Sequence, residues 1–154
     1  MRNRDIELAR QWIEKADHDL VTARAVLALP DGPTDTPCFH AQQAVEKALK
    51  SLLTAHGVKF KRIHDLVAHF DAAVPRLPEL KAYREQIAEL AYFAIHIRYP
   101  ADSADPTRDE AEAAVRLAER VLGMVAQAIC AKTNGKKRWT KSKMLHGSCQ
   151  AASP

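Results

Sequence analysis

The sequence predicts an all-α protein, an antiparallel up-and-down bundle of four long helices and one short helix. Of its 154 residues, 47% are hydrophobic and 27% are charged, which is the mix typical of a globular domain. The chain has only 5 glycines and 6% aromatic residues, a composition that favours helix over sheet. Apolar residues recur at three- and four-residue spacing, and prolines and glycines interrupt this periodicity at short connections.

Two long helices are predicted in the first part of the chain, each with one apolar stripe. The first covers residues 5–29 and ends where Pro30, Gly32 and Pro33 interrupt it. The second begins near Thr36, the expected N-cap, and Gly57 supplies its left-handed end. The stripes consist of Ala9, Trp12, Ile13, Ala16, Leu20, Ala23 and Leu27 in the first helix and Ala41, Ala44, Val45, Ala48, Leu49 and Leu52 in the second.

Three further helices are predicted after residue 60. A short one covers about 63–73, a longer one covers about 79–98 and stops before Pro100, and the last runs from Thr107 to about 131. Thr107 and Glu110 have the spacing of a capping box at the start of the last helix. The expected core residues are Ile63, Leu66, Val67 and Phe70, then Leu80, Tyr83, Ile87, Leu90, Ala91, Ala94 and Ile97, then Ala111, Ala114, Val115, Ala118, Val121, Leu122, Val125 and Ile129.

The chain divides into a helical domain, residues 1–131, and a basic C-terminal tail, residues 132–154, expected to be disordered because it has no apolar period. The tail holds six of the 23 Lys and Arg residues and none of the 19 acidic residues, so the net charge of +4 hides a domain with a net charge of −2. The overall charge therefore does not predict nucleic-acid binding by the domain. We expect a chain that ends at Lys132 to keep its melting midpoint within a few degrees.

Several classes of protein are disfavoured by what the sequence lacks. No apolar run approaches the roughly 20 residues needed to cross a bilayer, and the charged N-terminus does not resemble a signal peptide. Cys38, Cys130 and Cys149 form neither a disulfide framework nor a metal motif. The histidines lack the spacing of metal ligands, so no metal or other cofactor is expected. These features predict a cytoplasmic protein without membrane contact.

A polar face on the second helix is the first candidate for function. It contains His40, Gln43, Lys47, Lys50 and Thr54, and Glu46 lies four residues before Lys50, the spacing of a helical ion pair. On its own this pattern is typical of a solvated face, and a binding surface is the alternative. At the start of the short helix, Asp65 favours the helix dipole and His64 is a possible cap, which is also more often a structural arrangement.

The end of the fourth helix carries the sharpest candidate, Arg98. At 100° per residue it falls on the same stripe as Leu80 and Ile87, so its guanidinium needs acceptors. A buried carboxylate that only fixes packing and a bound phosphate are both open at this stage. Tyr92, Phe93 and His96 lie off the stripe and predict a second covered surface on this helix, the interface of a homodimer.

Taken in order, four sequence segments resemble the HEPN domain family, named for nucleotide binding in higher eukaryotes and prokaryotes. They are KADHDL at residues 15–20, CFHAQQAVEKALK at 38–50, HDL at 64–66 and RYP at 98–100, and the resemblance covers about residues 5–130. It implies an antiparallel helical bundle that forms homodimers. The branch with RYP is found with a separately encoded minimal nucleotidyltransferase, in a toxin–antitoxin-like pair.

The resemblance also bears on catalysis. Many relatives are metal-independent endoribonucleases in which a His follows the functional Arg after four to six residues, whereas no His follows Arg98 before residue 106. We therefore expect a non-catalytic module that binds a nucleotide or RNA. Its expected ligand-binding residues are Arg98, Tyr99, His64, His40 and Lys47. The alternative is a metal-independent endoribonuclease in which Arg98 acts with His64 or His96.

Overall fold

The computed structural model describes residues 3–60, 65–96 and 104–133, without the side chains of residues 94–96. Its helices are α1 (Asn3–Leu27), α2 (Asp35–Ala55), α3 (Leu66–Ala73), the 3-10 helix η1 (Pro78–Tyr83), α4 (Arg84–His96) and α5 (Arg108–Lys132). These segments contain no strand, and the predicted all-α class is confirmed. None of the helices described combines the length and apolar character that a bilayer crossing demands.

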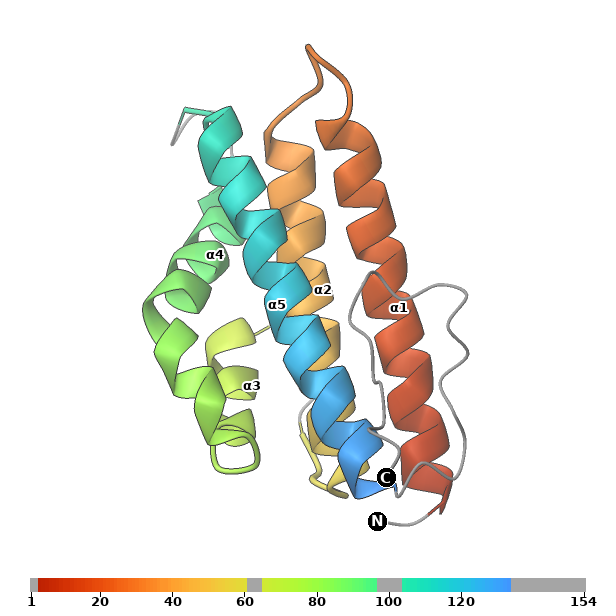
Figure 1. Cartoon of the computed structure of the whole chain (residues 1–154). Helices are drawn as coiled ribbons and strands as arrows, with labels where there is room; N and C mark the ends of the chain where they lie inside the picture. Colours follow the sequence, from red (N-terminus) through yellow and green to blue (C-terminus); the bar gives the residue numbers. More distant parts are fainter. Residues whose placement is uncertain (1–2, 61–64, 97–103, 134–154) are drawn as a thin grey trace, which may run out of the picture.

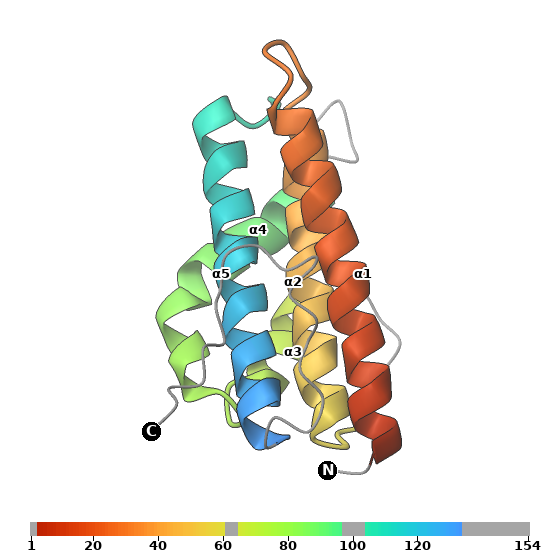
Figure 2. The same cartoon turned by 45° about the vertical axis from the view of Figure 1, so that its right-hand side comes forward.

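Helix α2 is the central element of the bundle. It contacts α1, α5, α3 and α4, whereas the other helices have fewer neighbours (Figures 1 and 2). Helices α1, α2 and α5 run side by side along the length of the molecule, and α3 and α4 pack on the remaining side of α2. The core is therefore arranged around α2.

The predicted apolar stripes form this core. All six stripe residues of α2 and all eight of α5 are buried, as are Ala9, Ile13, Ala16, Leu20 and Ala23 of α1. Trp12 and Leu27, the other predicted members on α1, are only partly buried. Where α1 and α2 meet, the Ser51 hydroxyl donates a buried hydrogen bond of 2.8 Å to the carbonyl of Ala9. Burial of these stripes is the main stabilising contribution of the three long helices.

The two ends of α2 differ in how well the sequence predicts them. Gly57 has a φ of +67°, the left-handed conformation expected after the helix. The expected N-cap is wrong, because the helix begins at Asp35 and Thr36 lies inside its first turn. The carboxylate of Asp35 accepts the backbone N–H of Thr36 at 2.7 Å. An acidic side chain in the first turn thus binds a backbone donor that has no partner within the helix.

Helices α3 and α4 begin later than the sequence predicts. Asp65 is the N-cap of α3 and accepts the backbone N–H of Ala68 at 2.9 Å. Val67, placed in the core by the sequence, is 39% exposed, so that expectation is wrong. The predicted helix from residue 79 starts as η1 and becomes α-helical at Arg84. A proline at the first position of η1 supplies a fixed φ but no N–H donor.

The remaining expected core residues of this region divide into three groups. Leu66, Phe70, Leu80, Ile87 and Leu90 are buried, and Tyr83 and Ala91 pack against the core while partly exposed. Ile63 and Ile97 lie outside the described residues, as does the side chain of Ala94.

The start of α5 is fixed by two sets of polar contacts. In the predicted capping box, which is confirmed, Thr107 Oγ1 accepts the Glu110 N–H at 3.2 Å and Glu110 Oε2 accepts the Thr107 N–H at 2.7 Å. The Arg108 guanidinium donates to the carbonyls of Leu27 and Leu29 at the end of α1. The carbonyls that α1 leaves unpaired therefore receive donors from α5.

Candidate functional site

The structure places two of the predicted site residues fully, His40 and Lys47 on α2. His96 lies at the end of α4, and its side chain is not among those described. His64, Arg98 and Tyr99 lie outside the described residues. Their roles, and the choice between a buried ion pair and a phosphate contact for Arg98, stay predictions.

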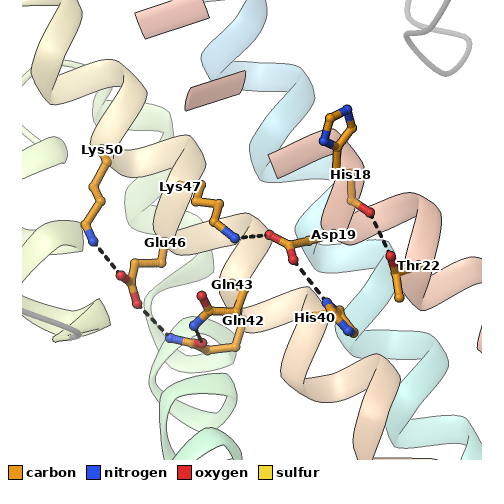
Figure 3. Close-up of polar contacts among 9 residues, drawn as sticks. All are labelled: His18, Asp19, Thr22, His40, Gln42, Gln43, Glu46, Lys47 and Lys50. Carbon is orange, nitrogen blue, oxygen red and sulfur yellow. Dashed lines mark hydrogen bonds and ion pairs between the residues drawn. The ribbon is translucent and has the colours of Figure 1, made fainter. Parts of the chain in front are cut away.

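His40 and Lys47 meet at one carboxylate, that of Asp19 on α1 (Figure 3). They are seven residues apart, which is two turns, so both lie on the same face of α2. His40 Nδ1 lies 3.0 Å from Asp19 Oδ1, and Lys47 Nζ forms an ion pair with Oδ2. The side chains of Asp19, His40 and Lys47 are 13%, 25% and 23% exposed. We call these three residues the α1–α2 cluster.

The α1–α2 cluster fixes the state of the His40 ring. An ionised carboxylate accepts hydrogen bonds and cannot donate them, so His40 Nδ1 carries the hydrogen of their contact. In the neutral ring, Nε2 is then left as an acceptor. No contact to Nε2 occurs within the described part of the chain beyond the edge-to-face packing of the ring on Phe39. The cluster thus offers an oriented acceptor beside the ammonium group of Lys47.

Asp19 was not singled out from the sequence, although it lies in the KADHDL string. The signal that could have found it is its place beside Leu20, at the edge of the apolar stripe of α1. A carboxylate at such an edge faces the neighbouring helix, and that helix carries cations. Which cations it meets depends on how α1 and α2 are aligned, and periodicity alone does not give that alignment.

A second polar group on α2 corrects the expectation of a solvated face. Lys50 Nζ donates to Glu46 Oε1 at 2.6 Å, and these side chains are only 8% and 2% exposed. Gln42 donates to Glu46 Oε2 at 3.2 Å and accepts from Gln43 at 2.8 Å (Figure 3). This face is buried because α2 is surrounded by other helices and Lys50 lies over the Trp12 ring of α1. A buried ion pair must be matched by hydrogen bonds, and these are present.

Two other histidines have partners that give them structural roles. The Nδ1 atoms of His56 and His69 lie 2.9 Å and 2.6 Å from the carbonyl oxygens of Leu52 and Asp65, four residues earlier in each case. His69 is buried against Phe60, so it is no candidate for an exposed base. Burial lowers the pKa of His56 below 6.5, and its Nε2 lies 2.6 Å from Lys132 Nζ.

Neither a thiol nucleophile nor a metal cluster is formed by the residues described. Burial, with smaller contributions from Glu110 and Asp35, raises the pKa of Cys38 to about 11, so this thiol stays protonated at neutral pH. Within residues 3–60, 65–96 and 104–133, no three His, Cys, Asp or Glu side chains group as metal ligands would. The α1–α2 cluster combines one carboxylate and one imidazole with a cation, which is suited to an anionic ligand.

The outer surface of α4 carries the predicted interface residues. Tyr92 is 59% exposed, Phe93 is partly exposed, and their ring centroids are 6.5 Å apart in an edge-to-face arrangement. The two aromatic side chains therefore lie on the outside of the bundle, as the sequence predicts.

Comparisons with known proteins agree with this architecture. The family model of the HEPN domain matches residues 9–129, from the second turn of α1 to near the end of α5. The chain is also similar to a protein of Methanocaldococcus jannaschii that bears the description "Putative toxin MJ1304". The two are 27% identical over 136 residues, which cover 79% of this chain and 88% of the archaeal protein. No solved structure matches the chain at a significant level.

Proposed function

Because this chain belongs to the HEPN domain family, we propose that it is the nucleotide- or RNA-binding component of a toxin–antitoxin-type pair and that it acts by binding rather than by catalysis. The family match over residues 9–129 carries the proposal. The likeness to an archaeal protein described as a toxin supports the assignment to such a pair. The missing His after Arg98 favours binding over catalysis.

The proposed ligand-binding surface joins the α1–α2 cluster to three residues outside the described segments. His40 and Lys47 place two nitrogen groups around one carboxylate at the edge of the bundle, and both remain partly exposed. Arg98, Tyr99 and His64 complete the surface in this proposal. An Arg guanidinium suits a phosphate because its planar fork binds two oxygens at once.

A titration with a fluorescent RNA and with labelled ATP tests this proposal. The variant Arg98→Ala should weaken binding while it leaves the thermal midpoint nearly unchanged. Arg98→Lys should restore binding only in part, because a point charge replaces the bidentate fork. The matched control is Arg116→Ala, which removes an exposed guanidinium from α5. Unchanged affinity in Arg98→Ala, together with a loss of stability of about 3–5 kcal/mol, would instead establish Arg98 as half of a structural ion pair.

We further propose that the chain works as a homodimer with a separately encoded minimal nucleotidyltransferase, in the cytoplasm. The exposed rings of Tyr92 and Phe93 support the homodimer, and the RYP string supports the enzyme partner. Co-expression of the chain with a nucleotidyltransferase encoded beside it, followed by affinity purification, tests the pair. Recovery of both proteins together, and relief by the partner of any growth arrest that the chain causes alone, are the expected results.

The second candidate is a metal-independent endoribonuclease, which the archaeal relative's description as a toxin favours. In this case Arg98 would act with His64 or His96. The purified chain is incubated with labelled tRNA in EDTA, beside the variant Arg98→Ala. Cleavage that survives EDTA and is lost in the variant would establish the nuclease. Intact tRNA bound with measurable affinity is the result that we expect.

A further inference from the structure

We propose that the α1–α2 cluster is a ribose-phosphate recognition site, at which Asp19 orients His40 so that the site prefers ribonucleotides to 2′-deoxyribonucleotides. This inference rests on the proposed function, because it assumes that the chain binds a nucleotide or RNA. Asp19 is a positioning residue in this proposal, and His40 and Lys47 contact the ligand.

The contact between Asp19 and His40 leaves one ring nitrogen free to accept a hydrogen bond. Asp19 Oδ1, 3.0 Å from Nδ1, holds the ring hydrogen on that atom. His56 differs, because its Nε2 already meets the ammonium group of Lys132 at 2.6 Å. His69 differs as well, because its ring is buried. His40 therefore has the oriented and partly exposed acceptor that a hydroxyl donor requires.

Lys47 supplies the complementary charge next to this acceptor. An ammonium group has three donors, and the ion pair with Asp19 Oδ2 uses one of them. His40 and Lys47 bind the two oxygens of the same carboxylate, so their nitrogen groups are close neighbours (Figure 3). In RNA, the 2′-hydroxyl and the 3′-phosphate are on adjacent carbons of one sugar. The hydroxyl can donate to His40 Nε2 while the phosphate oxygens accept from Lys47.

A purely structural role explains less of this arrangement. The α1–α2 interface is already closed by apolar side chains and by the buried hydrogen bond from Ser51 to Ala9. Linking the two helices needs one cation opposite Asp19, yet two nitrogen groups converge there. All three side chains lie at the edge of the interface and keep contact with solvent. The 2′-hydroxyl is the group by which a protein can distinguish RNA from DNA at such a site.

The test compares short ribo- and deoxyribo-oligonucleotides of one sequence, each with a fluorescent label. The wild-type chain should bind the ribo-oligonucleotide more tightly. His40→Asn should reduce the ratio of the two affinities by about tenfold, the value of one hydrogen bond of about 1.4 kcal/mol, and leave the deoxyribo affinity unchanged. Asp19→Ala should reduce the same ratio, whereas Lys47→Gln should weaken binding of both probes. The matched controls, His18→Asn and Lys15→Gln, change exposed residues of α1 near the cluster and should change neither affinity.

A second measurement keeps the inference separate from the proposed function. Nitrogen NMR of the histidine side chains should show the hydrogen of the neutral His40 ring on Nδ1, and Asp19→Ala should release it. A wild-type spectrum with this hydrogen on Nε2 overturns the inference whatever the chain binds. Equal affinity of the wild type for both probes also overturns it but leaves nucleotide binding intact. Failure of both probes to bind overturns the proposed function and the inference together.

Discussion

The ion pair of Glu46 and Lys50 lies within the bundle, and it predicts a large effect of a single substitution. Lys50→Met removes the cation, and the Glu46 carboxylate then stays in a site where it is only 2% exposed. The free energy of unfolding should fall by about 3–5 kcal/mol, the usual cost of breaking a buried pair from one side. Urea denaturation followed by circular dichroism measures this change.

The double variant Glu46→Leu with Lys50→Met is the control. Replacing both charges with apolar side chains removes the unpaired carboxylate, so this protein should be more stable than Lys50→Met alone. A double variant that is no more stable than the single variant would show that Glu46 is needed for its other contacts, among them the amide of Gln42.

His56 predicts a pH dependence of stability. Its pKa is below 6.5 in the folded chain, mainly because burial disfavours the charged ring, and the Lys132 charge adds to this. The unfolded chain therefore binds a proton more readily, and the contribution of His56 is lost as the pH falls below 6.5. His56→Gln should lose less stability than the wild type between pH 7 and pH 5, as measured by thermal melts. Identical pH profiles would contradict the prediction.

At the scale of the element, the capping box of α5 gives a second prediction about stability. Thr107→Ala removes the acceptor of the Glu110 N–H and should cost about 1 kcal/mol. Thr36→Ala is the matched control, because Thr36 lies inside the first turn of α2 and caps nothing. Its stability should change by less than about 0.5 kcal/mol. Equal losses in the two variants would mean that the capping box contributes nothing specific.

Which elements the sequence predicts well depends on how many sides of a helix are covered. Helices α1 and α5 have a solvated side, so their apolar stripes and their buried residues agree closely. Helix α2 is covered on several sides, so its polar residues Glu46, Lys50 and Thr54 are buried, although they have the spacing of a solvated face. Periodicity identifies the polar face but does not show what lies against it.

The candidate site shows the same difference. His40 and Lys47 are predictable because both lie on one helix at a spacing that the sequence displays. Asp19 is not, because its contact with them depends on the alignment of two helices and joins residues 21 and 28 positions apart. At the scale of the whole molecule, a site built between helices is therefore predicted only in part by patterns within each helix.

The last prediction concerns the assembly of the whole molecule. The aromatic side chains of Tyr92 and Phe93 lie on the outer surface of α4, while Ile87 and Leu90 of the same helix are buried in the core. Two apolar surfaces on one helix favour a homodimer, with a mass by light scattering of about twice 17.1 kDa. Phe93→Asp should give a folded monomer, because it places a charge in the interface. Val21→Asp, at an exposed position of α1, should remain a dimer. A wild-type monomer at micromolar concentration would contradict this assembly.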